Sequence, residues 1–201
     1  HEKLTYIHQK NSGVSSARNL GISLSKGLYI CYLDSDDLWH RDKLEEVNRY
    51  VNANPEIDLI FHDFIKHDIR EEAPYKSSNS DIFPFIYEIF ENSESSDHYW
   101  TGKDESAFNL VMRGYPFYPS SLIVKRNIHT HFRWDPGVLK SEDFNLILKL
   151  SLIYSFGYID KILTTIKIHD NNKSADTLTK ETVIINTMKA VQQLYCKGRQ
   201  S

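Results

Sequence analysis

The chain has 201 residues and a mass of 23.5 kDa, the size of one domain that can bury a sufficient core without disulfides or zinc. Hydrophobic residues make up 40% and charged residues 25%, which argues against disordered, collagen-like and membrane-spanning classes, and the net charge of −3 provides no basic footprint for duplex nucleic acid. Two cysteines, Cys31 and Cys196, are too few for a secreted disulfide framework, so we expect a cytoplasmic protein.

The N-terminal part of the chain predicts a short strand and then a helix. Apolar and polar residues alternate from Leu4 to His8, which is typical of a half-buried strand. Ser15 or Ser16 can cap the helix, and Gly27 is a standard stop signal after it. The buried stripe of this helix is predicted, from the i, i+3, i+7 spacing, to consist of Ala17, Leu20 and Leu24.

A continuous apolar run at residues 28–33 predicts a strand that is buried on both faces. The run ends abruptly at four polar residues, Asp34 to Asp37. A helix is then predicted over residues 41–52 and another strand over 57–64. This helix–strand–helix–strand order is typical of an α/β fold with right-handed crossovers and a mostly parallel sheet flanked by helices.

The periodicity weakens between about residue 65 and residue 106, and the pattern does not decide between a mobile loop and a small helical insert. Regular elements return in the last part of the chain. We predict a helix over 107–113, a strand over 120–124, an almost wholly apolar helix over 142–154, a strand or hairpin over 158–168 and an amphipathic helix over 180–196.

Asp34, Asp36 and Asp37 follow the predicted buried strand, at the edge where open α/β sheets bind ligands. Carboxylates two residues apart on a tight turn can coordinate one hard cation, Mg²⁺ or Mn²⁺, that also holds a diphosphate. In the structural alternative, Asp34 starts a turn and Asp36 or Asp37 caps the next helix. The buried strand before the cluster favours the functional interpretation.

The segments around this cluster resemble family 2 glycosyltransferases, which are nucleotide-sugar-dependent enzymes of the GT-A fold. The matching segments are NSGVSSARNLG at 11–21, LDSDDLW at 33–39, PSSLIVKR at 119–126, SEDFNL at 141–146 and KIHDNNKS at 167–174. The resemblance implies a GT-A, Rossmann-like domain over residues 1–175, with an unmatched variable insert over 65–105, followed by a C-terminal helix over 176–201.

The resemblance also implies roles for residues at the donor site. Asp34 and Asp36 would form the donor-binding D-x-D motif, with Asp36 on the Mn²⁺ or Mg²⁺ that bridges the donor phosphates and Asp34 on the ribose or the metal. Asp37 is a neighbour whose role differs among relatives. Arg18 would line the nucleotide side of the pocket, and His169 would lie near the diphosphate or the metal. The structural alternatives are a surface arginine and a structural histidine.

Asp143 resembles the family's catalytic base, with Glu142 as the alternative base. An inverting transfer is a single displacement, in which one carboxylate takes the proton of the attacking acceptor hydroxyl. In the structural interpretation Ser141 caps a helix and both acids favour its positive N-terminus. That position would lower the pKa of the carboxylate unless burial opposes it.

Three tryptophans and two serines are weaker candidates. Trp39, Trp100 and Trp134 could stack on sugar faces, although tryptophan is more often a core residue. Ser120 and Ser121 either face the acceptor or belong to a half-buried strand. The residue types alone do not decide between these alternatives.

The family normally opens with a strand–helix–strand unit that precedes the segment seen here, whereas this sequence begins at His1 in the middle of the pattern. We therefore expect an N-terminally truncated domain. The expected function is inverting transfer of a sugar from a nucleoside-diphosphate sugar to a carbohydrate or lipid-linked acceptor, in surface polysaccharide synthesis. The alternative is a non-catalytic GT-A fragment or binding module.

The resemblance further implies an enzyme, and the charge balance indicates no nucleic-acid partner. Homo-oligomer formation and peripheral association with the inner face of the membrane are open expectations. A metal phosphohydrolase is a third hypothesis, suggested by the His-Asp pairs at 62–63, 67–68 and 169–170. The spacing of these histidines fits no metal-ligand set, so this hypothesis is the weakest of the three.

Overall fold

The computed structural model describes residues 4–71, 75–92, 96–102, 105–138 and 140–170. The helix predicted over 180–196, and Cys196 with it, lie outside these residues. The described residues form a mixed sheet in the order β1-β7-β3-β8-β6-β5, with β2 paired to β8 and β4 to β3. The strands are β1 (Tyr29–Cys31), β2 (Leu38–Trp39), β3 (Leu59–Asp68), β4 (Tyr75–Ser78), β5 (Phe90–Asn92), β6 (Tyr99–Gly102), β7 (Leu122–Lys125) and β8 (Phe156–Ile168).

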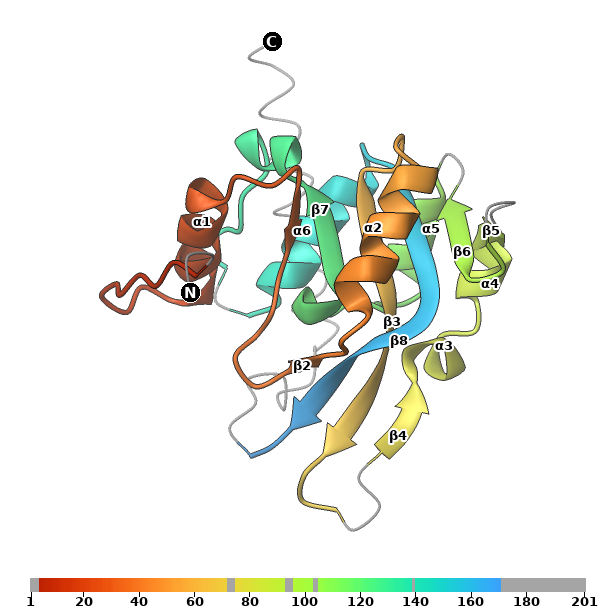
Figure 1. Ribbon diagram of the computed structural model, residues 1–201, viewed down its shortest axis with the longest axis horizontal. Helices are drawn as coiled ribbons and strands as arrows, with labels where there is room; N and C mark the ends of the chain where they lie inside the picture. Colours follow the sequence, from red (N-terminus) through yellow and green to blue (C-terminus); the bar gives the residue numbers. More distant parts are fainter. Residues whose placement is uncertain (1–3, 72–74, 93–95, 103–104, 139, 171–201) are drawn as a thin grey trace.

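Helices cover both faces of this sheet, which confirms the α/β class (Figure 1). The expectation of a mostly parallel sheet is wrong, because β3 and β8 are the only described strands that pair in parallel and every other described pair is antiparallel. Val47 and Tyr50 of α2 pack with Ile60, Ile123 and Ile159 on one face. The helices α5 and α6 pack on the other face, in a cluster that includes Phe61, Phe156 and Tyr158. The helices are α1 (Val14–Leu24), α2 (Lys43–Ala53), α3 (Asn79–Ile82), α4 (Ile86–Ile89), α5 (Ser106–Arg113), α6 (Glu142–Ser151) and the 3-10 turns Pro119–Ser121 and Arg126–Thr130.

The directions of the strands place the carboxyl ends of β1, β3 and β8 at one edge of the sheet. Strand β7 is antiparallel to both β1 and β3, and β3 is parallel to β8 over its whole length. Strands β1, β3 and β8 therefore run in the same direction. Their carboxyl ends meet at the edge where ligands bind in sheets of this kind.

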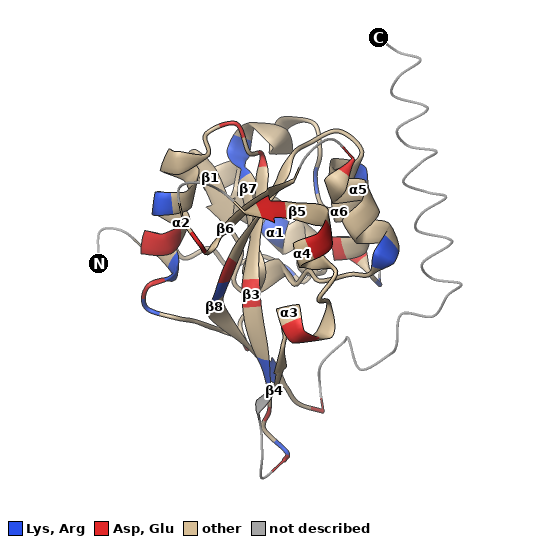
Figure 2. Ribbon diagram, turned by 90° about the vertical axis from the view of Figure 1, so that its right-hand side faces the viewer, with Lys and Arg blue, Asp and Glu red and all other residues tan. Residues whose placement is uncertain are grey.

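Strand β1 is less buried than its apolar sequence predicts. Ile30 and Tyr32 are buried, but Leu28 is 80% exposed and Leu33 is 50% exposed. The expectation of burial on both faces is wrong because the strand covers only Tyr29–Cys31 at the end of the described sheet, so that Leu28 and Leu33 lie outside it. Figure 2 shows that acidic and basic residues are interspersed along the helices and strands, in keeping with the small net charge.

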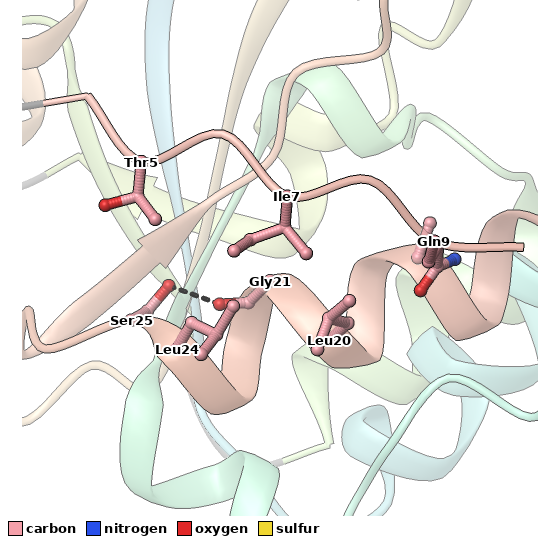
Figure 3. A pocket seen from close by; sticks show the side chains of 8 residues that line it. Thr5, Ile7, Gln9, Leu20, Gly21, Leu24 and Ser25 are labelled. Carbon is pink, nitrogen blue, oxygen red and sulfur yellow. Dashed lines mark hydrogen bonds between the residues drawn. The ribbon is translucent and has the colours of Figure 1, made fainter.

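The N-terminal segment and α1 line an open pocket of about 460 Å³ instead of packing together as a strand and a core helix. Residues 4–10 form no strand, and Ser15 and Ile22 are the buried residues of α1. The stripe predicted to be buried faces the pocket, opposite the side chains of Thr5, Ile7 and Gln9 (Figure 3). Among the described residues, the lining has no charged side chain.

The variable insert folds into short elements rather than a loop. It contains β4, α3, α4, β5 and β6, and β6 pairs with β8 in the main sheet. Ile86 and Phe90 anchor it in the core, where they are 0% and 2% exposed. The weak periodicity of this region reflects elements of only three or four residues, which are too short to show a repeat.

We predict that replacing Gly157 of β8 by alanine destabilises the folded chain. A Cβ atom at this position would lie 2.7 Å from Cζ of Tyr50, whose hydroxyl donates a hydrogen bond of 2.7 Å to the carbonyl oxygen of Trp100. Gly157→Ala should therefore lower the free energy of unfolding by about 1–3 kcal/mol, measured by urea denaturation. Adding Tyr50→Phe should recover part of the loss. The matched control is Gly21→Ala in α1, where an added Cβ meets no atom within 4 Å. Equal stability of the two alanine variants would contradict the prediction.

Candidate active site

The acidic turn after β1 meets the end of β8. His169 follows β8, and its Nε2 atom lies 3.0 Å from Oδ2 of Asp36. The backbone N–H of Lys167 donates a hydrogen bond of 3.1 Å to Oδ1 of Asp37. Asp36 and Asp37, two of the predicted site acids, thus contact the segment that carries His169.

Arg18 connects this turn to the start of α6. Its guanidinium donates to both carboxylate oxygens of Asp34, at 2.8 and 3.1 Å, and to Oε1 of Glu142 at 3.0 Å. It also stacks 4.3 Å above the ring of Trp134, and only 10% of its side chain is exposed. Burial lowers the pKa of Arg18, but the charges and hydrogen bonds of Asp34 and Glu142 outweigh burial and raise it. Arg18 therefore binds two of the predicted site carboxylates.

Asp143 has the environment expected of a general base. Its side chain is half-buried, and the backbone N–H of Phe144 donates to its Oδ1 atom at 2.8 Å. Burial and then the charge of Glu142 raise the pKa of Asp143 to about 6, against the opposing effects of Phe144 and Arg18. The position at a helix N-terminus does not dominate, because burial has the larger effect.

Ser141 does not cap α6 as the structural alternative supposes. It occupies the N-cap position, but its side chain makes no capping hydrogen bond, and its φ of 58° lies in the left-handed region. Such a conformation is uncommon for a residue with a Cβ and is found preferentially at functional sites. Glu105 at the N-cap of α5 has a similar φ of 65°, so this conformation does not decide between the two interpretations.

Ser120 fits neither alternative left open for it, because it lies in the 3-10 turn Pro119–Ser121 and not in a half-buried strand. It is fully buried, as is Ser121, so neither faces an acceptor. Instead the Ser120 hydroxyl accepts a hydrogen bond of 2.9 Å from the backbone N–H of Asp34. Burial raises the pKa of Asp37 to about 6, and the Ser120 hydroxyl is the largest opposing influence. The sequence signal was its place in the matching segment 119–126.

Trp134 and Trp39 contact residues around the acidic turn, whereas Trp100 lies on β6 opposite Tyr158, near the start of β8. Trp134 is fully buried beneath Arg18. Trp39 is half-buried, and its indole N–H donates to the carbonyl oxygen of Ser120 at 3.2 Å. Trp100 is half-buried beside Tyr87, with a ring-centroid distance of 5.1 Å.

Asp36 and His169 fit a divalent cation that takes its other ligands from a substrate. Within the part of the chain that the structure describes, no three His, Cys, Asp or Glu side chains form a complete metal-binding group. A carboxylate oxygen and an imidazole nitrogen 3.0 Å apart are, however, suitable neighbouring ligands of one Mn²⁺ or Mg²⁺ ion. Phosphate oxygens and water would have to complete the coordination.

The histidines do not support a phosphohydrolase. His62 is fully buried in β3, where burial holds its pKa well below the ordinary value, and its Nδ1 atom lies 2.7 Å from the backbone oxygen of Asp63. Asp63 is itself bound by the Ser80 hydroxyl at 2.7 Å. These side chains belong to the hydrogen-bonded interior of the sheet.

The sequence model of Glycosyl transferase family 2 matches residues 1–119, which is more than half of the chain. The chain belongs to glycosyltransferase family 2. The family resemblance expected from the sequence is thereby confirmed. Among the described helices of this family 2 chain, none is both long enough and apolar enough to cross a bilayer.

One relative of this family 2 chain is an uncharacterized glycosyltransferase of Rickettsia conorii, which is 27% identical over 83% of this chain and 24% of the relative. Another is the chondroitin synthase of Escherichia coli, which is 26% identical over 89% of this chain and 23% of the relative. The chain thus spans about a quarter of the length of these relatives. The crystal structure of S. aureus TarS 1-349 in complex with UDP matches with a TM-score of 0.52 and 12% identity, over 78% of this chain and 40% of TarS. This likeness confirms the expected GT-A type of α/β fold.

Proposed function

We propose that the chain is the catalytic domain of an inverting glycosyltransferase that moves a sugar from a nucleoside-diphosphate sugar to a carbohydrate or lipid-linked acceptor. The observation that supports this proposal is that two groups of side chains, the Asp36–His169 pair and Asp143, lie at the same edge of the sheet. The Asp36–His169 pair can hold a cation with a diphosphate, and Asp143 has the raised pKa of a base. Arg18 joins the two groups through Asp34 and Glu142.

In this mechanism Asp143 accepts the proton of the acceptor hydroxyl as the acceptor oxygen attacks the anomeric carbon. The half-buried carboxylate is basic enough for this step because its pKa is raised to about 6. Glu142 is held by Arg18 and is therefore the less available base. A bound Mn²⁺ or Mg²⁺, held by Asp36 and His169, would neutralise the negative charge of the departing diphosphate. Asp34, Asp37 and Arg18 keep their proposed donor-binding role as the frame of that site.

Comparisons support the substrate class. TarS, which shares the fold, was crystallised with UDP, and one relative is named for the synthesis of chondroitin, a polysaccharide. We extend the proposal to surface polysaccharide synthesis in the cytoplasm, at or near the inner face of the membrane, by a domain that covers residues 1–175. Self-association is part of the same proposal. A non-catalytic GT-A binding module remains the alternative outcome of the tests below.

Thermal unfolding with UDP, GDP, TDP and CMP, each with and without Mn²⁺, tests the donor site. A nucleotide at ten times its dissociation constant should stabilise the chain by about 1.4 kcal/mol, which raises Tm by about 3–6 °C. We expect a Mn²⁺-dependent rise with one diphosphate. Asp36→Asn should abolish the rise, because the amide keeps the shape of the side chain but loses the charge that holds the cation.

Asp42→Asn is the matched control, because Asp42 is exposed at the start of α2 and makes no capping hydrogen bond. This variant should keep the full nucleotide-dependent rise. A rise that persists in Asp36→Asn would remove Asp36 from the cation site. If no nucleotide changes Tm in the unsubstituted chain, the donor site is refuted and the binding-module alternative is preferred.

A further inference from the structure

Lys43 is a buried cation that the mechanism above does not use. It is the first residue of α2 and is 1% exposed. Its ammonium group donates hydrogen bonds of 2.6 Å to the carbonyl oxygen of Ser120 and 3.4 Å to Oγ1 of Thr164, and it lies 4.1 Å above the ring of Trp39. Lys43 is the largest charged side chain among the described residues that are less than 2% exposed.

The carbonyl oxygen that Lys43 binds belongs to Ser120, the residue whose hydroxyl binds the acidic turn Asp34–Asp37. The carbonyl oxygen of Ser120 accepts from Lys43, from the indole N–H of Trp39 at 3.2 Å and from the Thr164 hydroxyl at 3.2 Å. The hydroxyl of the same residue accepts from the backbone N–H of Asp34 at 2.9 Å. Ser120 thus links α2 and β8 to the first residue of the turn.

Stability alone does not explain a charge in this position. Removing an ammonium from water is costly, and apolar residues of similar volume are often equally stabilising. Burial lowers the pKa of Lys43 to about 7, and the nearby Cys31 and Asp37 oppose that effect only in part. A methionine could fill the space above Trp39, but it could not bind the Ser120 carbonyl.

We propose that Lys43 is a positioning residue for donor binding: by holding Ser120 it fixes the turn Asp34–Asp37, which presents Asp36 and His169 to a nucleoside diphosphate and its cation. This inference rests on the function proposed above. Lys43 makes no hydrogen bond to the three turn carboxylates in the contacts described, although the charge of Asp37 is near enough to affect its pKa, so its direct link to the turn is the one through Ser120. It is thus distinct from the cation ligands and from the proton-accepting Asp143.

Hydrogen exchange of the unliganded chain tests the effect on the turn without relying on nucleotide binding. In Lys43→Met the amides of residues 34–37 should exchange about tenfold faster, because Ser120 loses its shortest hydrogen bond. Lys43→Arg keeps a donor and should restore slow exchange. The control is Lys125→Met on β7, since Lys125 binds the Glu56 carbonyl oxygen at 3.3 Å and Asp58 at 3.2 Å instead of Ser120. Unchanged exchange in a folded Lys43→Met chain would overturn the proposal, as would faster exchange spread over the whole sheet.

Titration with Mn²⁺ and UDP, GDP, TDP or CMP, whichever raises the Tm of the unsubstituted chain, completes the test. Lys43→Met should raise Kd about tenfold with an unchanged or higher Tm, and Lys43→Arg should restore much of the affinity. A parallel loss of Tm and affinity would show a merely structural residue. The two proposals fail differently: if the unsubstituted chain binds none of the four nucleotides, the donor function is refuted, whereas unaltered affinity in Lys43→Met refutes only the role of Lys43.

Discussion

Asp143→Asn should lower the rate of sugar transfer by about 10²–10⁴-fold, which is the usual contribution of a general base. The amide preserves the shape of the side chain but cannot accept the proton of the acceptor hydroxyl. UDP binding in the presence of Mn²⁺ should be unchanged, because the proposed cation ligands are Asp36 and His169. The measurement is release of UDP from UDP-sugars in the presence of oligosaccharide acceptors, at saturating donor.

The pH dependence provides a second check on the same residue. Transfer by the unsubstituted chain should rise with pH and level off above about 6, the raised pKa of Asp143. Protonation of this group favours the folded state, so its contribution to stability is present below the unfolded pKa near 3.8 and is lost as pH rises through about 6. Asp143→Asn is always neutral at this position and should therefore have an unchanged or higher Tm at pH 7.

Glu142→Gln is the control for this assignment. It removes the neighbouring charge while leaving Asp143 as the base, so transfer should survive with a profile shifted to lower pH. A larger loss in Glu142→Gln than in Asp143→Asn would make Glu142 the base. A loss of Tm in Asp143→Asn that matches the loss of rate would show that Asp143 has only a structural role.

Arg18→Met should destabilise the chain by about 3 kcal/mol, because removing one partner of a buried ion pair leaves uncompensated charges. Asp34 and Glu142 would lose their shared cation, and Trp134 would lose the stacked guanidinium. For a chain of this size the expected decrease of Tm is about 6–12 °C. Arg18 also lowers the pKa of Asp143, so the pH profile of transfer should shift to higher pH. Calorimetry and the transfer assay measure the two effects.

The matched control is Arg41→Met, which removes an exposed arginine just before α2 and should change Tm little. A second variant tests the cause of the loss. Adding Glu142→Gln to Arg18→Met removes one of the two stranded carboxylates and should recover part of the stability. Failure of that double variant to recover any Tm would mean that the apolar packing of Arg18, not its charge, carries the effect.

The fold class followed from the alternation of helical and strand patterns, because periodicity is a local property of the sequence. Burial was harder to predict, since it depends on which strands become neighbours. Leu44 fits the inward stripe of α2 by spacing but is 57% exposed, whereas Lys43 beside it is buried. The same cause explains why Leu28 lies at the surface despite its apolar surroundings in the sequence.

The candidate site was predictable as a set of residue types but not as a network. The resemblance singled out Asp34, Asp36, Asp143 and His169, and the structure brings their segments to one edge. Their assignment to donor, metal and base roles stays a prediction. The link through Arg18 could not be foreseen, because a salt bridge to two distant carboxylates leaves no periodic pattern in the sequence.

The parallel pairing of β3 with β8 has a consequence for how the chain is made. Strand β3 lies in the middle of the sheet, yet its partner is separated from it by everything from β4 to α6. After β3 has been synthesised, β4 and β7 can pair with it first, but β8 becomes available only when most of the remaining described chain has been made. Long-range pairing of this type folds slowly and exposes strand edges to aggregation. His169 leaves the ribosome later still, so the proposed cation site is complete only after synthesis has passed β8.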